Sequence, residues 1–281
     1  MTNSNNFIDE KINDNMKIGL IGLGVVGAAV KFGMELIGHK VFVYDIKYPE
    51  TSIKDVLGTE LCFLCLPTQT NEDGKNDTSI VEKVVSKLSQ ANYKGIVTIK
   101  STVIPGATDR LAKKYPNLRF AFCPEFLRER AAVIDFVENH DVCAIGVYND
   151  RDYQIIKDAH GRLPKNFSKL TPKEAEFVKY FSNTFNALRI VFANEFYEVC
   201  KSAGANYTRI KDCVVKKENT PNVYLDCHEN LRGFGGPCLP KDTLAFASFV
   251  KDLGLNLKLF ETIVEENKKF PKTILKGMRS N

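Results

Sequence analysis

Short apolar runs and amphipathic stretches alternate along the first half of the chain. The apolar runs have the composition of β-strands and lie at residues 16–21, 41–45, 61–67, 95–102, 119–125 and 141–147, while residues 79–91 and 106–114 have helical periodicity. Strands that are apolar on both faces and separated by helices are typical of a parallel sheet covered on both sides. The pattern predicts an α/β fold, a doubly wound, Rossmann-like parallel sheet whose ligands bind beyond the carboxyl ends of the strands.

The second half of the chain is helical in pattern. The stretch TPKEAEFVKYFSNTFNALRIVFANEFYEVCKSAGAN has a capping box of Thr171 and Glu174 at its start and Gly204 at its end, so we expect one long helix. A further helix, DTLAFASFVKDLG, is expected to have Asp242 as its N-cap and to end at Gly254. So long a first helix usually joins two lobes. We therefore expect a long central helix followed by an all-α second domain.

The chain of 281 residues is longer than one hydrophobic core usually serves, so two domains are expected. We place a disordered tail at residues 1–15 and the Rossmann-like domain at residues 16–168. The central helix and the helical domain are expected at residues 169–270, followed by a basic tail at residues 271–281.

Composition places the chain among ordinary soluble proteins, with 44% hydrophobic and 26% charged residues. No apolar run approaches the roughly 20 residues that span a bilayer, and the N-terminus lacks the basic and apolar regions of a secretory signal. The net charge of +5 is scattered, which gives no indication of nucleic-acid binding but suits an anionic small substrate. We expect a cytoplasmic protein with neither a membrane nor a nucleic-acid partner.

The cysteines give no indication of a metal site. Most of the 8 lie in apolar runs and are expected to be reduced. Cys62 and Cys65 form a C-x-x-C by letter, but residues three apart in a strand point to opposite faces. No second pair or histidine cluster completes a zinc set, so we expect no bound metal.

A glycine motif lies between the first strand and the first helix. Gly22, Gly24 and Gly27 form G-x-G-x-x-G, and Asp45 ends the next strand. This context favours a dinucleotide site, because the tight turn and the helix N-terminus bring backbone N–H groups to a pyrophosphate. Asp45 would accept hydrogen bonds from the adenosine ribose, which favours NAD over NADP. The alternative is a purely structural turn with a surface aspartate.

The loop GFGGPCLPKD presents Cys238 between glycines and prolines. The thiol precedes a predicted helix N-terminus and lies three residues before Lys241, and both features favour the thiolate. A cysteine in such a loop is presented as a nucleophile. Asp242 follows four residues later, and its alternative role is that of a plain helix cap.

A polar stripe runs along the long helix. Lys179 and Asn183 are four residues apart and Glu176 lies on the same face. The stripe is either part of a site or a solvated helix surface.

Several motifs, in this order, resemble the UDP-glucose 6-dehydrogenase family, within the wider group of UDP-glucose and GDP-mannose dehydrogenases. They are GLIGLGVVG, LPTQTNEDG, STVIPGAT, CPEFLRE, EFVKYFSNTFNALRI and GFGGPCLPKD. The family oxidises the C6 alcohol of a nucleotide sugar to a carboxylate in two NAD-dependent steps through a cysteine-bound thioester. The likeness covers roughly residues 16–270, with the cysteine loop as its most specific part.

The resemblance implies roles for individual residues. Cys238 would be the nucleophile, and Lys179 and Asn183 would stabilise the oxyanion and hold water beside Asp242. Glu125 would be the general base for thioester hydrolysis, with Thr102 as a partner for water or cofactor. The residues implied to contact NAD are Gly22, Gly24, Gly27, Asp45, Pro67, Thr68, Thr102, Glu129 and Lys241. Those implied to contact the nucleotide sugar are Glu125, Phe126, Leu127, Lys179, Asn183, Arg232, Phe234 and Gly235.

The sequence departs from the family pattern in several places. The family has a third domain that holds much of the UDP, and this sequence stops at Asn281, about where that domain should begin, so we expect the chain to lack it. The segment between Asp45 and Leu61 has room for one short helix. Asn222 stands where the family has a substrate-binding arginine, for which Arg232 is a candidate replacement, and Arg130 replaces an expected glycine.

We expect an NAD-dependent enzyme that converts UDP-glucose to UDP-glucuronate in two hydride transfers. The resemblance further implies a homodimer that pairs through the central helix. The alternatives are a GDP-mannose 6-dehydrogenase, a β-hydroxyacid dehydrogenase-like enzyme, or a non-catalytic NAD-binding subunit that needs a partner chain.

Overall fold

The computed structural model describes residues 15–71 and 73–271. The predicted tails at 1–15 and 271–281 therefore lie, apart from Asn15 and Pro271, outside the described residues. The chain divides into two compact units. The first unit comprises residues up to Thr68 together with Thr78–Glu176, and the second comprises Gln69–Asp77 and the residues from Phe177 onward. The domain boundaries given above stay predictions.

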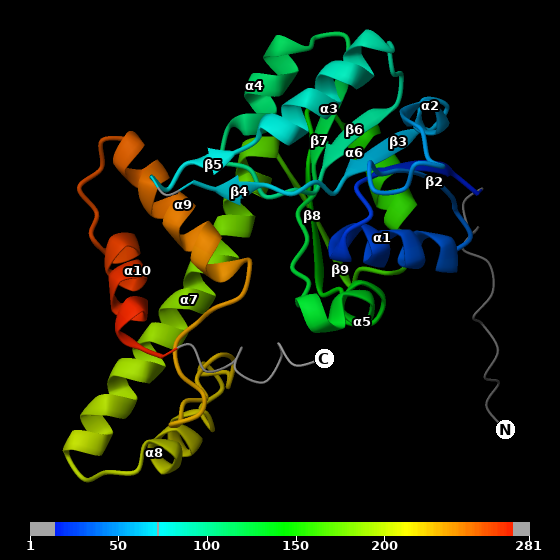
Figure 1. The fold of residues 1–281 in the computed structure, drawn as a ribbon. Helices are drawn as coiled ribbons and strands as arrows, with labels where there is room; N and C mark the ends of the chain where they lie inside the picture. Colours follow the sequence, from blue (N-terminus) through cyan, green and yellow to red (C-terminus); the bar gives the residue numbers. More distant parts are fainter. Residues whose placement is uncertain (1–14, 72, 272–281) are drawn as a thin grey trace, which may run out of the picture. The chain divides into compact units, whose positions relative to one another are not determined.

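The first unit is built on a seven-stranded sheet in the order β2-β1-β3-β6-β7-β8-β9 (Figure 1). The strands are β1 Lys17–Ile21, β2 Lys40–Tyr44, β3 Leu61–Leu64, β6 Ile96–Ile99, β7 Arg119–Phe122, β8 Val142–Gly146 and β9 Asn166–Leu170. Neighbouring strands pair in parallel except β7 and β8, which pair in antiparallel fashion. The predicted Rossmann-like α/β fold is confirmed, with β8 and β9 reversed relative to the other strands.

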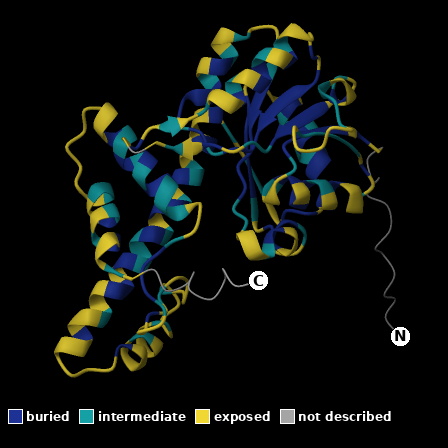
Figure 2. Ribbon diagram, viewed as in Figure 1, coloured by how far each residue is buried: buried dark blue, intermediate teal, exposed yellow. Residues whose placement is uncertain are grey.

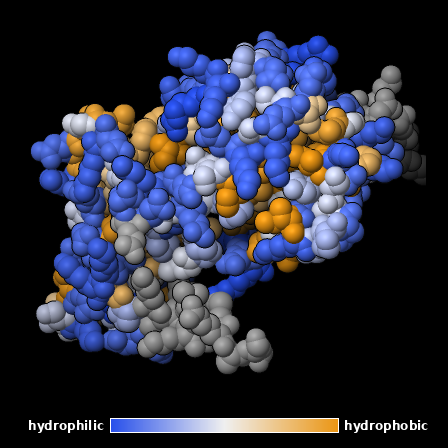
Figure 3. All heavy atoms as spheres, turned by 45° about the horizontal axis from the view of Figure 1, so that its top comes forward, coloured by the Kyte–Doolittle hydropathy of each residue, from blue (hydrophilic) through white to orange (hydrophobic). Residues whose placement is uncertain are grey.

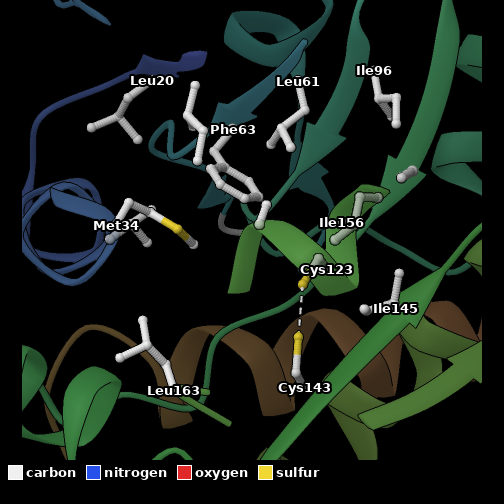
Figure 4. Close-up of a cluster of buried hydrophobic side chains, with 14 of the residues drawn as sticks. Leu20, Met34, Leu61, Phe63, Ile96, Cys123, Cys143, Ile145, Ile156 and Leu163 are labelled. Atoms are coloured by element: carbon white, nitrogen blue, oxygen red, sulfur yellow. Dashed lines mark hydrogen bonds between the residues drawn. The ribbon is translucent and has the colours of Figure 1, made fainter. Parts of the chain in front are cut away.

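Helices cover both faces of this sheet (Figure 1). They are α1 Val25–Leu36, α2 Ile53–Val56, α3 Ser79–Gln90, α4 Ala107–Lys114, the 3₁₀ turn η1 Glu129–Ala131, α5 Ala132–Val137 and α6 Asp150–His160. Alternate strand residues enter two apolar clusters, because successive side chains point to opposite faces. One cluster joins the sheet to α1, α5 and α6, and Figure 4 shows it around Phe63; the other joins the sheet to α3 and α4. The central strands are accordingly buried on both sides (Figure 2).

Within the described residues, the helices and strands of the second unit are four helical segments and a short hairpin. Its helices are most of α7 Pro172–Ser202, then α8 Tyr207–Val214, α9 Leu239–Asp252 and α10 Leu259–Lys269. The hairpin pairs β4 Gln69–Thr70 with β5 Asn76–Asp77 and contacts α9. The hydroxyl of Thr70 donates to the carbonyl of Lys241 at 3.3 Å. Strand β4 thus packs on the helix that follows the cysteine loop.

The predicted boundaries of the long helix are confirmed. Glu174 Oε2 accepts from the backbone N–H of Thr171 at 2.8 Å, and the Thr171 hydroxyl oxygen accepts from the Glu174 N–H at 3.4 Å. This pair is the capping box that the sequence predicts. Gly204, past the last turn, has φ of 72°, a conformation that favours glycine.

The predicted start of α9 is wrong. The helix begins at Leu239, so Cys238 is its N-cap residue and Asp242 lies inside the helix, 1% exposed. Pro240 fits the first turn, where a missing N–H costs nothing, and allows the helix to start earlier than an aspartate cap would suggest. The cysteine is therefore attached directly to a helix end.

Among the described residues, no helix combines the length and apolar character needed to cross a membrane. Polar side chains make up most of the face seen in Figure 3, with apolar side chains gathered in patches between them.

Candidate active site

The three glycines of the β1–α1 turn serve different purposes. Gly22 has φ of 95°, and a Cβ there would lie 2.4 Å from the carbonyl oxygen of Cys65. A Cβ on Gly27 would lie 2.0 Å from the carbonyl oxygen of Gly22. A Cβ on Gly24 would meet nothing within 4 Å. Packing of the turn thus requires Gly22 and Gly27, whereas at Gly24 the backbone is open to the approach of a ligand.

The electrostatics of this turn suit a dinucleotide. Gly24 is the N-cap residue of α1, and the first turn of this helix contains no acidic residue that would oppose an anionic phosphate at the positive end of the helix dipole. Asp45 follows β2, and its carboxylate accepts from the N–H of Leu23 at 2.6 Å and of Lys47 at 2.8 Å. A carboxylate has lone pairs for further donors, such as ribose hydroxyls. The residues present therefore fit NAD.

The residues after β3 and β6 lie at the same edge, because parallel strands end together. Pro67 is exposed, Thr68 is buried and Thr102 is half-buried. The hydroxyl of Ser101 accepts from the N–H of Leu66 at 2.8 Å, which ties the two loops together. Three of the predicted NAD contacts are thus brought to the carboxyl edge of the sheet.

The segment after β7 is held by an ion pair that the sequence analysis missed. Arg128 donates from Nε and Nη2 to the Asp135 carboxylate at 2.9 and 2.6 Å, and its backbone N–H donates at 2.8 Å. These bonds lower the pKa of Asp135 to about 2, against the opposing effect of burial. They fix the turn that carries the half-buried Phe126 and Leu127.

Two acidic residues of this segment have different environments. Glu125 is buried, 5% exposed, and forms an ion pair with Lys100, whereas Glu129 begins η1 and is exposed. Lys100 is a second residue that sequence reasoning missed. The available signal was a lysine at the end of the apolar run GIVTIK.

Lys100 belongs to a buried polar cluster with Cys123, Cys143 and His160. Its ammonium lies 3.5 Å from Cys123 Sγ and 3.4 Å from His160 Nε2. The two sulfur atoms are 3.6 Å apart. Figure 4 marks their contact with a dashed line. A hydrogen bond from Cys143 lowers the pKa of Cys123 well below its ordinary value, aided by Lys100 against the effect of burial. The two sulfur atoms and the imidazole of His160 lie within 4.8 Å of one another, but the ammonium of Lys100 places a positive charge against this group, which disfavours a bound cation.

Glu176 is buried rather than solvated. Its carboxylate accepts from the N–H groups of Gly106 and Thr108 at 2.5 and 2.8 Å, and from the Thr108 hydroxyl at 2.6 Å. These are the free donors at the start of α4. Glu176 is therefore a helix-capping residue of the first unit, so this end of the polar stripe has a structural role.

The cysteine loop and the helix residues predicted to act with it lie in the second unit. Cys238 is exposed, and Lys179 is half-buried on α7 one turn before Asn183. The Asn183 amide donates to Asp242 at 2.5 Å, and Lys241 also contacts that carboxylate at 2.5 Å. Asn183 is 7% exposed and Asp242 1%. The alternative of a solvated stripe thus fails for Asn183 as well.

The residues before the cysteine are anchored to α7 and α10. Arg232 is buried, donates from Nε to Asn194 Oδ1 at 2.7 Å, and forms an ion pair with Glu198. Asn267 of α10 accepts from the N–H of Phe234 at 2.7 Å and donates to its carbonyl at 3.0 Å. The guanidinium of Arg232 thus has protein partners on α7, and Phe234 is held by its backbone. Gly235 is half-buried.

The predicted site residues therefore fall into two groups. The first unit carries the glycine motif, Asp45, the residues after β3 and β6, and the 125–129 segment. The second unit carries Lys179, Asn183, the 232–235 segment, Cys238, and the pair Lys241 and Asp242. Their catalytic and binding roles stay predictions.

Two sequence models of one protein family match the chain. The NAD binding domain of the UDP-glucose/GDP-mannose dehydrogenase family matches residues 49–163, and the central domain of that family matches residues 173–269. The glycine motif lies before the first matched region, and its geometry supports the same cofactor independently.

Individual proteins agree with this assignment. A UDP-glucose 6-dehydrogenase of Rickettsia bellii is 28% identical over 91% of this chain and 68% of its own length. A GDP-mannose 6-dehydrogenase of Pseudomonas aeruginosa is 23% identical over 90% of this chain and 68% of its own. The solved UDP-glucose dehydrogenase of Pyrobaculum islandicum superposes with a TM-score of 0.84 at 28% identity, covering 94% of this chain and 70% of that one. The present chain thus spans about two thirds of the length of such relatives, and it belongs to the UDP-glucose/GDP-mannose dehydrogenase family of NAD-dependent oxidoreductases.

Proposed function

We propose that the chain catalyses oxidation of the C6 hydroxyl of a nucleotide sugar to a carboxylate, with UDP-glucose as substrate. The observation that carries the proposal is the exposed Cys238 at the N-terminus of α9, beside the buried Asn183–Asp242 pair, in a chain of this family. A thiol at a helix N-terminus is a favourable nucleophile, because the helix dipole stabilises its thiolate.

The proposed reaction uses Cys238 to retain the aldehyde. After the first oxidation, its sulfur attacks the C6 aldehyde carbon and forms a thiohemiacetal. The second oxidation converts this adduct to a thioester, which water hydrolyses to the carboxylate. NAD, when bound by the β1–α1 turn, Asp45 and the residues after β3 and β6, supplies the hydride acceptor for each oxidation.

The other residues of the proposal act on charge and water. Lys179 and Asn183 stabilise the oxyanion of the adducts, and Asp242 orients the Asn183 amide that it accepts from. Glu125 takes a proton from the attacking water, with Thr102 as a partner for water or cofactor. The 125–127 and 232–235 segments bind the nucleotide sugar, with the backbone of Phe234 fixed by Asn267.

The test is NADH formation at 340 nm with NAD and a panel of UDP-glucose, GDP-mannose, UDP-N-acetylglucosamine and a simple 3-hydroxy acid. Two NADH per UDP-glucose, abolished in Cys238→Ser but kept in Cys213→Ser, support the proposal. Cys213 is a matched control because it is another exposed cysteine, on α8. Undiminished turnover of Cys238→Ala on the 3-hydroxy acid would favour a β-hydroxyacid dehydrogenase. NAD binding without any turnover would favour a non-catalytic subunit that needs a partner.

GDP-mannose is the second candidate substrate, because a GDP-mannose 6-dehydrogenase matches the chain over a similar length. The same cysteine chemistry serves both sugars. A side-by-side comparison of kcat/KM for the two nucleotide sugars separates the candidates.

We further propose that α7 pairs two copies of the chain. Large apolar side chains are exposed along it at helical spacing, namely Phe181 at 72%, Phe185 at 42%, Phe192 at 56%, Phe196 at 41% and Val199 at 63%. An apolar stripe of this kind on a helix favours burial against a second helix. A homodimer satisfies this requirement.

A further inference from the structure

We propose that Asn194 of α7 is a positioning residue for the nucleotide-sugar site: its buried side-chain amide holds Arg232 and Gly233, and thereby sets where the segment before Cys238 lies. The inference rests on the proposed function, because it assigns what places the 232–235 segment that binds the sugar there. Asn194 is not among the residues that the sequence predicted for the site. All of these residues belong to the second unit, so their contacts lie within one compact body.

The Asn194 side chain is buried and bonded on both sides of its amide. The residue is 1% exposed, and its Oδ1 accepts from Nε of Arg232 at 2.7 Å and from the N–H of Gly233 at 3.1 Å. Its Nδ2 donates to the carbonyl of Ile190, one turn earlier on the same helix, at 2.8 Å. Only the amide oxygen can accept from the two donors of the loop, and only the nitrogen can donate to the helix carbonyl. The orientation of the amide is therefore fixed, and the loop takes its place from it.

The side chain of Arg232 needs such a partner. It is 4% exposed, and a buried charge is unfavourable unless it is paired and hydrogen-bonded. Its guanidinium forms an ion pair with Glu198, one turn after Asn194 on α7, and lies 4.7 Å from the centre of the Tyr197 ring and 5.2 Å from that of Phe270. Asn194 differs from these partners because it also holds the next peptide group. Its loss should therefore move the arginine side chain and the backbone together.

The backbone leads from this anchor to the nucleophile over a short distance. Gly233 has φ of 59°, and a Cβ there would lie 3.2 Å from Oδ1 of Asn267. The two hydrogen bonds between Asn267 and Phe234 hold the following residue, so amides from two helices fix the segment. Only residues 235–237 separate Phe234 from Cys238, the N-cap residue of α9. A displacement of the segment is therefore passed on to the thiol.

Two substitutions separate the oxygen that holds the loop from the nitrogen that bonds the helix. Asn194→Asp keeps an acceptor for both loop donors and lacks the donor to the Ile190 carbonyl. Asn194→Thr does the opposite, because its hydroxyl can donate to that carbonyl but is too short to reach the loop. The Thr184 hydroxyl makes such a bond on the same helix, to the Tyr180 carbonyl at 2.7 Å. Thr184→Val is therefore the control for losing a bond of this kind within α7.

The kinetic experiment measures NADH formation with UDP-glucose and NAD. We expect Asn194→Thr to lower kcat/KM for the sugar about 100-fold, the scale of a misplaced reacting group, through a higher KM and a lower kcat. The Kd of NAD should not change, because the glycine motif belongs to the other unit. Asn194→Asp and Thr184→Val should remain close to the wild type. The reverse order, with Asn194→Thr active and Asn194→Asp impaired, is the result of a purely helix-stabilising role and would overturn the inference.

Hydrogen exchange of the substrate-free protein separates this inference from the proposed function. Exchange is measured by mass spectrometry on a peptide that covers residues 231–236. The peptide should exchange faster in Asn194→Thr, because the Gly233 N–H loses its acceptor, and as in the wild type in Asn194→Asp and Thr184→Val. Equal exchange in Asn194→Thr and the wild type would also overturn the inference.

A second variant keeps the test decisive. If Asn194→Thr does not fold, Asn194→Ser is measured with the same two readouts, since its hydroxyl is equally short. The expected exchange pattern in a chain that forms no NADH with any nucleotide sugar would support the placement of the loop by Asn194 and contradict the proposed function alone.

Discussion

Asn183 of α7 donates a hydrogen bond of 2.5 Å to Asp242 of α9, and both side chains are buried. The pair joins the long helix to the helix whose N-cap is Cys238. The Asp242 carboxylate accepts from the Asn183 amide and contacts the Lys241 ammonium, so these bonds stabilise the helix end that carries Cys238.

Asp242→Ala should destabilise the chain, because it leaves the Asn183 amide and Lys241 without this acceptor. We expect a loss of about 3 kcal/mol in the free energy of unfolding, as for removal of one partner from a buried pair. Urea unfolding measures it. Asp252→Ala, at the exposed end of the same helix, is the matched control and should change stability little. Equal effects of both variants would contradict a specific role for the pair.

Substitutions of the three glycines in the β1–α1 turn should affect different properties, stability for Gly22 and Gly27 and NAD binding for Gly24. Gly22→Ala and Gly27→Ala should lower Tm strongly, since each new Cβ would lie within 2.4 Å of a carbonyl oxygen. Gly24→Ala should fold normally, because its Cβ meets no protein atom within 4 Å. Its NAD affinity should nevertheless fall, since a ligand would meet the methyl group. Thermal melts and calorimetric NAD titrations test this, and unchanged NAD affinity in Gly24→Ala would place the cofactor elsewhere.

The Arg128–Asp135 pair should contribute an acid-sensitive part of the stability. Hydrogen bonds from Arg128 lower the pKa of Asp135 from 3.8 to about 2. The folded pKa is depressed, so the contribution is present above the unfolded value and is lost as the pH falls from about 4 to about 2. Discounted for the exposure of Arg128, it should be about 1 kcal/mol. Urea unfolding of Asp135→Asn should lack this part of the pH dependence that the wild type shows.

Asn267→Ala should loosen the segment before the cysteine. Phe234 would lose both backbone hydrogen bonds to the Asn267 amide, 2.7 and 3.0 Å in length. We expect a higher KM for the nucleotide sugar with NAD affinity unchanged, because the glycine motif belongs to the other unit. Asn256→Ala, in the exposed α9–α10 loop, is the control. A rise in the KM of both variants alike would contradict the assignment.

Charge on the apolar stripe of α7 should prevent dimerisation. Phe181→Lys and Phe192→Lys place charges at side chains that are 72% and 56% exposed, so the fold of one chain should tolerate them. Sedimentation analysis should then show a dimer for the wild type and a monomer for the variants. Lys165→Glu, exposed on the first unit, is the control for a change of charge alone. A monomeric wild type would refute pairing through this helix.

The local patterns of the sequence determined much of the molecule. Apolar runs and periodicity predicted the helices α3 and α4 and the strands β1, β2, β3, β6, β7 and β8. The capping box of α7 follows from side chains within one turn of each other. The roles of Gly22 and Gly27 also follow locally, because a tight strand–turn–helix connection demands glycine wherever the backbone closes on itself.

Tertiary structure decided what depends on distant partners. β9 is an edge strand, and its residues are only half-buried or exposed. Its sequence therefore lacks the apolar run from which a strand could be predicted. From the sequence, Glu176 is indistinguishable from a surface residue, but in the fold its carboxylate accepts hydrogen bonds from the N-terminus of α4. Lys100 likewise is only the residue at the end of an apolar run in the sequence, and in the fold it forms an ion pair with Glu125, which follows β7. A buried charge is stabilised only by the partner that the fold supplies, and sequence spacing does not encode partners that meet across a sheet.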